Sequence, residues 1–168
     1  MPDRITFDVF LEEYENISQL PVDCQTLIKQ ARASCKYAYA PYSNFLVGAA
    51  LLMENGEVVT GSNQENASSP NGLCAERVAL YSAAARFPSV AIKKLAVSAI
   101  RKEGSTFLPV TPCGSCRQVI SEYQSIQKFP IQIIMEGPET TILIANSVDI
   151  LLPFKFSAKN MESKNDQI

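Results

Sequence analysis

The sequence predicts one α/β domain in which helices cover the faces of a five-stranded sheet. Segments with helical spacing alternate with β-rich segments along the chain, which is the order expected for such a sheet. The dipeptide Asn55-Gly56 separates two β-rich runs and is a strong signal for a tight hairpin. The 168 residues are 46% hydrophobic and 19% charged, which suits a single hydrophobic core.

The helices are predicted from apolar spacing and from the residues that stop them. Apolar side chains recur at helical intervals before Pro41, which predicts a helix from Asp23 to Ala38. The segment that begins near Cys74 is rich in helix formers and stops at Pro88. Two further helical segments are expected, a long one at 113–126 and a short one at 147–153.

The strands follow from β-rich runs bounded by turn residues. The stretch "FLVGAALLMENGEVVTGSN" (45–63) predicts two adjacent antiparallel strands. Three more strands are expected at 91–100, 131–137 and 140–146.

Composition restricts the classes of function. The formal charge is −2 and the basic residues are scattered, so we expect no nucleic-acid partner. Apolar runs are short and the acidic N-terminus lacks an apolar signal core, so we expect neither a membrane span nor a secretory leader. Five cysteines, an odd count, favour free thiols in a reducing cytoplasm. Because the chain has no histidine, acid/base chemistry must use a carboxylate, a lysine or a thiol.

Cys113 and Cys116 begin a predicted helix, where the helix dipole lowers thiol pKa values. Such a pair can be a redox couple, half of a zinc site or core filling. Cys74 begins another predicted helix, and three thiolates around a dication with one open position would form a catalytic zinc site. A fourth ligand could come only from Cys24, Cys35 or a carboxylate, and we expect these two cysteines to be buried in the first helix.

Glu76 and Arg77 directly follow the first of these cysteines. By itself, Glu76 would be an ordinary first-turn glutamate favoured by the helix dipole. Beside an open metal site, it could take a proton from water and return it to the substrate. Arg77 lies on the same helical face as Cys74 and could donate to the thiolates, whose excess negative charge would otherwise weaken the metal as a Lewis acid. The alternative is that Arg77 is an ordinary surface residue.

"CAER" followed 39 positions later by "PCGSCRQV" resembles the zinc-dependent cytidine deaminases of the small, all-cysteine type. The likeness extends through "YAPYSNFLVGAALL", "GSNQENAS" and "LLPFKF", and it predicts a catalytic domain at 23–156, an N-terminal extension at 1–22 and a polar tail at 157–168. It implies a three-layer fold with a mixed sheet, a homotetramer with shared active sites and one zinc per chain. The implied reaction is hydrolysis of cytidine and 2′-deoxycytidine by a zinc-activated hydroxide in pyrimidine salvage.

The resemblance also implies a role for individual residues. The metal ligands would be Cys74, Cys113 and Cys116, with Glu76 as the proton shuttle and Arg77 against the sulfurs. The substrate contacts would be Phe45 stacking on the base, Asn63 and Glu65 at the ribose 3′-hydroxyl, Ala75, and Phe156 from an adjacent subunit. Because the Glu65 carboxylate would repel a 5′-phosphate, nucleosides are favoured over nucleotides.

Two features depart from the family's usual pattern, namely Ser69 in place of a tyrosine and the amino-acid sequence of segment 101–111. Three other functions compete with cytidine deamination. One is deamination of another cytosine compound, such as an aminoacylated nucleoside antibiotic, which the N-x-E pattern of Asn63 and Glu65 disfavours. Another is a zinc or redox module without enzymatic activity. The third is a nucleic-acid editor, which would need a basic groove, and the charge of this chain argues against one.

Overall fold

The computed structural model describes residues 2–161. The strands are β1 (Glu12–Tyr14), β2 (Phe45–Met53), β3 (Val58–Ser62), β4 (Ile92–Arg101), β5 (Phe107–Leu108), β6 (Gln132–Glu136) and β7 (Ile142–Ala145). The helices are α1 (Val22–Ser34), α2 (Ala75–Arg86), α3 (Gly114–Gln127) and α4 (Val148–Leu151). Within the described residues, no helix combines the length and apolar character needed to cross a membrane.

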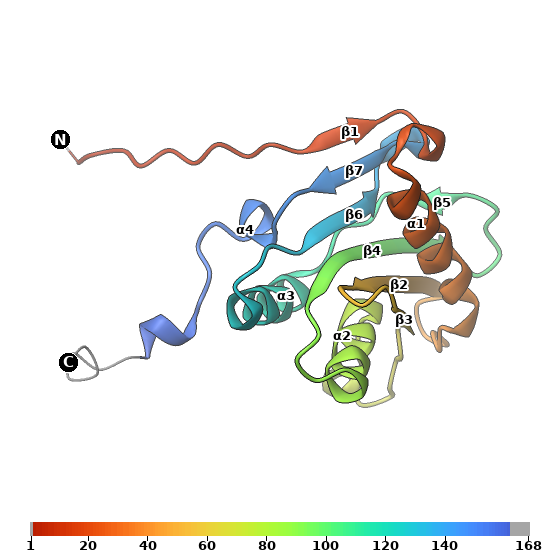
Figure 1. The fold of residues 1–168 in the computed structure, drawn as a ribbon. Helices are drawn as coiled ribbons and strands as arrows, with labels where there is room; N and C mark the ends of the chain where they lie inside the picture. The colour runs from red at the N-terminus through yellow and green to blue at the C-terminus, as the bar shows by residue number, and fades with distance from the viewer. Residues whose placement is uncertain (1, 162–168) are drawn as a thin grey trace.

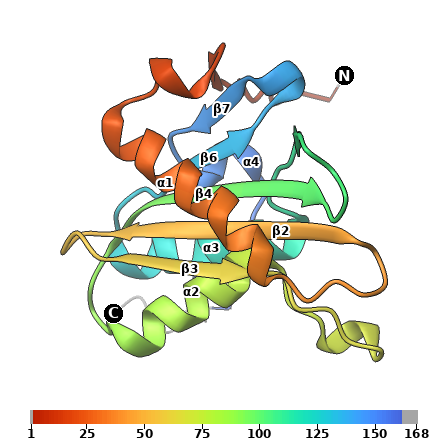
Figure 2. The ribbon, with the colours of Figure 1, turned by 90° about the vertical axis from the view of Figure 1, so that its right-hand side faces the viewer.

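The seven strands form one mixed sheet in the order β1-β7-β6-β4-β2-β3, with β5 added to β4. Strands β4 and β6 are parallel and the other pairs are antiparallel. Helix α1 lies on one face of the sheet, and α2 and α3 lie on the other (Figures 1 and 2). The predicted α/β class and three-layer arrangement are therefore confirmed.

The predicted number of five strands is wrong, because β1 and β5 also join the sheet. The five predicted strands correspond to β2, β3, β4, β6 and β7. Strands β1 and β5 contain three and two residues, which is too short for a recognisable alternation of side chains. Their pairing depends on edges offered by β7 and β4, so it is a tertiary effect that local sequence does not encode.

Two hydrophobic cores fill the spaces between the layers. Along β2, Ala49, Leu51 and Met53 face the core beneath α2 and α3, whereas Ala50 faces the core beneath α1. This alternation follows from the two-residue period of a strand. The first helix ends at Ser34, four residues before the predicted end, and a 3₁₀ turn at Cys35–Tyr37 completes the segment.

Gly61 allows α2 to lie directly against the sheet. A Cβ atom at this position would lie 2.5 Å from the Ala75 carbonyl oxygen and 2.6 Å from the Ala79 nitrogen. Only a glycine fits such a close backbone approach. The beginning of α2 is thereby fixed over the carboxyl-terminal half of β3.

Candidate active site

Two helix N-termini meet at one spot and bring three thiols together. Cys74 precedes α2 and Cys113 precedes α3, each with extended backbone angles, and Cys116 lies in the first turn of α3. The Cys74 and Cys113 sulfurs are 3.7 Å apart, and those of Cys113 and Cys116 are 3.5 Å apart. All three sulfurs lie within 4.8 Å of one another. The predicted cluster therefore forms from segments that are distant in sequence.

The spacing of these sulfurs fits zinc. A tetrahedral zinc ion with Zn–S bonds of about 2.3 Å separates its sulfur ligands by about 3.8 Å. The other two cysteines cannot complete the ligand set, because Cys24 in α1 and Cys35 in the turn that follows it are buried on the opposite face of the sheet. The cluster thus offers three protein ligands and leaves a fourth position for a small molecule.

Charge at the cluster favours a cation. Hydrogen bonding from the Cys116 thiol and the adjacent Arg77 guanidinium lower the pKa of Cys74 to about 5, although partial burial opposes the shift. The ionised Cys74 sulfur in turn raises the pKa of Cys116. One sulfur of the group is therefore readily ionised at neutral pH, as a metal ligand must be.

Arg77 lies against the cluster, as the sequence predicts. Its Nη2 atom donates to the Cys74 sulfur at 3.7 Å. Its Nε atom is buried and has no hydrogen-bond partner among residues 2–161. The guanidinium therefore places positive charge beside the thiols.

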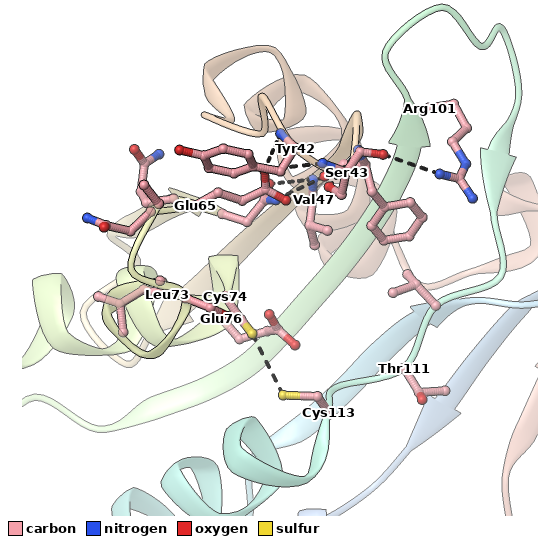
Figure 3. A pocket seen from close by; sticks show the side chains of 18 residues that line it. Tyr42, Ser43, Val47, Glu65, Leu73, Cys74, Glu76, Arg101, Thr111 and Cys113 are labelled. Atoms are coloured by element: carbon pink, nitrogen blue, oxygen red, sulfur yellow. Dashed lines mark hydrogen bonds between the residues drawn. The ribbon is translucent and has the colours of Figure 1, made fainter.

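Glu76, the second residue of α2, is almost fully buried, with 3% of its surface exposed. Burial raises the pKa of Glu76 to about 7, and the nearby Cys74 thiolate adds to this shift. The Glu76 carboxylate lies beside the Cys74 and Cys113 sulfurs at the floor of a pocket (Figure 3). A carboxyl group in this position can accept and return a proton.

The pocket has a volume of about 710 Å³, which suits a ligand of nucleoside size. Several predicted substrate residues line it, namely Phe45, Asn63 and Glu65, together with Ser69. Glu65 accepts hydrogen bonds from the backbone N–H groups of Tyr42 and Ser43 at 2.9 and 3.3 Å. Hydrogen bonding from the Ser43 hydroxyl and from these amides lowers the pKa of Glu65, which keeps it an anion.

Asn63 joins the pocket to the start of β2. Its Oδ1 atom accepts from the Val47 N–H at 2.8 Å, and its Nδ2 atom donates to the Phe45 carbonyl at 2.9 Å. The amide therefore fixes the backbone that carries the Phe45 ring. This structural contact was not expected from the sequence, which suggested only a sugar contact.

Two predicted substrate residues lie outside the pocket of their own chain. Ala75 is fully buried and is not part of the lining. Phe156 is 59% exposed, and its backbone carbonyl accepts a hydrogen bond from Gln118 of α3 at 2.8 Å. The Phe156 ring thus belongs to the outer surface of the subunit.

Arg101, Val110 and Thr111 are among the lining residues that the sequence did not identify as part of the site. They belong to segment 101–111, which the sequence marked only as a departure from the family pattern. Its position directly before Pro112 and Cys113 is the signal that could have placed it beside the metal ligands.

This pocket and fold define a class of protein. Three close thiols beside a buried carboxylate, at the N-termini of two helices, are the parts of a mononuclear metal site that activates water. The class is that of metal-dependent α/β enzymes acting on a small ligand.

Comparison with known proteins gives the family. The model for the cytidine and deoxycytidylate deaminase zinc-binding region matches residues 22–133. A cytidine deaminase of Halalkalibacterium halodurans is 40% identical over 140 residues, covering 83% of this chain and 98% of that protein. A probable cytidine deaminase of Dictyostelium discoideum is 33% identical over 145 residues, covering 86% of this chain and 91% of that protein.

The crystal structure of a cytidine deaminase from Burkholderia pseudomallei has the same fold, with a TM-score of 0.66 and 40% identity. The match covers 78% of this chain and 97% of that chain. The chain therefore belongs to the cytidine and deoxycytidylate deaminase family, and zinc is its cofactor.

Proposed function

We propose that this protein hydrolyses cytidine and 2′-deoxycytidine to uridine and 2′-deoxyuridine, releasing ammonia, in pyrimidine salvage. The observation that carries this proposal is the position of buried Glu76 beside three thiols in a pocket of nucleoside size. The similarity to proteins described as cytidine deaminases supports it. The catalytic domain would span residues 23–156, between the N-terminal extension and the polar tail.

Cys74, Cys113 and Cys116 would hold the zinc. When bound, zinc acts as a Lewis acid that makes water more acidic. Arg77 would offset part of the negative charge of the three sulfurs through its contact with Cys74. That contact would preserve the acidity on which the reaction depends.

Glu76 would move the protons of the reaction. Its carboxylate would take one proton from the attacking water and deliver it to the pyrimidine ring nitrogen, and would then move the remaining proton of the added hydroxyl to the leaving amino group. The amino group can then leave as ammonia rather than as an amide anion. Burial of Glu76 excludes bulk water from this transfer.

Phe45, Asn63 and Glu65 would hold the nucleoside. The half-buried Phe45 ring would stack on the cytosine, and Glu65 and Asn63 would bind the 3′-hydroxyl. Glu65 also supports a nucleoside over a nucleotide, because its carboxylate would repel a phosphate group nearby. Ala75, which lies between Cys74 and Glu76, would contribute through its backbone.

We further propose a homotetramer whose pockets are shared between subunits. Phe156 supports this arrangement, because it is exposed on its own subunit yet fixed to α3, the helix that carries Cys116. A cytoplasmic location is supported by the five free thiols, since thiols persist in a reducing compartment.

Loss of cytidine absorbance tests the function directly. Purified protein should convert cytidine to uridine and ammonia, and a strong zinc chelator should abolish the conversion. Glu76→Gln should retain zinc and fold but lose nearly all turnover. Glu122→Gln is the matched control, because Glu122 is an exposed residue of α3 and should not affect the rate.

Three results would contradict the proposal. Zinc without turnover of any cytosine nucleoside would indicate a non-enzymatic zinc module. Turnover of aminoacylated cytosine nucleosides alone would indicate an antibiotic deaminase. Full activity in Glu76→Gln would remove Glu76 from the proton transfers.

A further inference from the structure

Arg101 lines the pocket next to Phe45, the residue whose ring is predicted to stack on the base. It is the last residue of β4 and pairs in register with Phe45, the first residue of β2. Its guanidinium carbon lies 5.4 Å from the centroid of the Phe45 ring. A guanidinium within about 6 Å of a ring centroid is attracted to the π-system. Arg101 therefore contacts the Phe45 ring from the neighbouring strand.

Arg101 also contacts the loop that holds Glu65. Its Nη1 atom donates to the Ser43 carbonyl at 3.4 Å, and the Ser43 N–H donates to the Glu65 carboxylate (Figure 3). The Lys102 N–H donates to the Asn44 carbonyl at 2.9 Å, so the end of β4 and this loop are also joined through their backbones. One side chain thus contacts both the ring and the loop that orients the carboxylate.

The charge of Arg101 is not matched by a carboxylate. Among residues 2–161, no acidic side chain lies within ion-pair distance of its guanidinium. It is also the single lysine or arginine among the residues that line the pocket. Its guanidinium contacts Phe45 and Ser43, both of which shape the binding site.

We propose that Arg101 is a positioning residue that sets the Phe45 ring and the Glu65 carboxylate at the spacing of a pyrimidine base and its sugar. This inference rests on the proposed function, because it assigns the base to Phe45 and the 3′-hydroxyl to Glu65. Arg101 acts through these two residues and takes no part in proton transfer. Its removal should weaken nucleoside binding and leave the chemical step intact.

Arg101→Gln tests the inference with two companion variants. The KM for cytidine should rise by about fivefold to tenfold, and kcat should stay within about twofold. Arg101→Lys should restore part of the affinity, because lysine keeps the charge but not the planar fork. Lys102→Gln is the matched control, since it removes the same charge from the next residue, which lies outside the pocket lining. Its KM should equal that of the wild type.

A substrate comparison separates positioning from a general structural effect. Wild-type protein should lose affinity for 3′-deoxycytidine, which lacks the hydroxyl that Glu65 binds. In Arg101→Gln, removal of the 3′-hydroxyl should cost less affinity than in the wild type, because Glu65 is no longer held at the correct spacing. The effect of the mutation and the effect of removing the hydroxyl are therefore coupled. Urea unfolding of each variant and calorimetric titration with uridine provide readouts independent of turnover.

Defined results would overturn the inference. Equal KM values for Arg101→Gln and Lys102→Gln, or strictly additive losses for 3′-deoxycytidine, would mean that Arg101 does not position the site. A loss confined to cytidine 5′-phosphate would instead identify Arg101 as a phosphate contact. If wild-type protein neither converts cytidine nor binds uridine, the proposed function fails first, and the inference fails with it.

Discussion

Gly61→Ala should damage the active site although residue 61 is not part of the pocket lining. The added Cβ would lie 2.5 Å from the Ala75 carbonyl oxygen, whereas ordinary contact begins at 3.4 Å. The backbone at the start of α2 must therefore move by the difference, about 0.9 Å. Since Cys74 precedes this helix and Glu76 follows Ala75, the shift would carry both away from the thiols of α3.

The size of the effect follows from this displacement. Overpacking of a well-packed interior typically costs about 1–3 kcal/mol of the free energy of unfolding. Metal sites tolerate changes of roughly 0.2 Å in ligand distance. A catalytic group displaced by about 1 Å can lower the rate about 100-fold. Gly61→Ala should therefore unfold at lower urea concentration, lose zinc more readily to a chelator, and show a kcat lower by about 10- to 100-fold.

Gly114→Ala is the matched control. Gly114 lies between Cys113 and Cys116 on the other helix of the site, and an added Cβ there meets no atom within 4 Å. Its free energy of unfolding should be unchanged or raised by up to about 1 kcal/mol, because alanine restricts the unfolded chain. If Gly61→Ala matches Gly114→Ala in urea midpoint, zinc retention and kcat, helix α2 is not held by this contact.

Two further predictions concern assembly and pH. Chains carrying Glu76→Gln or Phe156→Ala should each have low activity by themselves. When the two are refolded together, activity should partly return, because some pockets would combine an intact Glu76 with an intact Phe156. A mixture that shows only the average of the two low activities would exclude a contribution across the interface. Lys94 donates a hydrogen bond to Asp23 at 2.7 Å. This bond is the main reason that the pKa of Asp23 lies below its ordinary value of 3.8. Because this folded-state pKa is depressed, the pair stabilises the protein above pH 3.8 and loses its effect as pH falls through the folded-state value. Asp23→Asn should thus cost about 0.2–1 kcal/mol of unfolding free energy at pH 7, as expected for a partly exposed pair, and nothing in stronger acid. A pH-independent cost in urea titrations would exclude the ion pair as its source.

The metal cluster could be predicted because its signals are local. Cys74 and Cys113 each begin a helix, and Cys116 follows one turn later, so short-range spacing already indicates which thiols can converge. Their convergence also requires α2 and α3 to pack on the same face of the sheet. The sequence indicated that two helix N-termini could point at one spot, but not which face of the sheet carries each helix. It already placed Glu76 two residues after Cys74, and the family resemblance supported the role of Glu76 as the proton shuttle.

The residues that sequence missed depend on pairings between distant segments. Arg101 is placed beside Phe45 by the register of β2 and β4, which no local pattern specifies. The amide of Asn63 is used by the backbone of β2 through the same kind of contact. Phe156 was predicted from the family resemblance, and within its own subunit it is exposed and lies outside the pocket lining. The role proposed for Phe156 requires a neighbouring chain.

The pairing of β1 with β7 affects how readily one molecule associates with another. Glu12, Glu13 and Tyr14 occupy the outer side of β7 opposite Ile142, Leu143 and Ile144. Without them, an apolar strand would present its free backbone groups at the margin of the sheet, which invites edge-to-edge aggregation. The two glutamates place negative charge along that margin and discourage strands of other molecules from adding there. A chain shortened to begin at residue 22, where the family match starts, would therefore keep every residue proposed for catalysis and yet be prone to precipitate during expression.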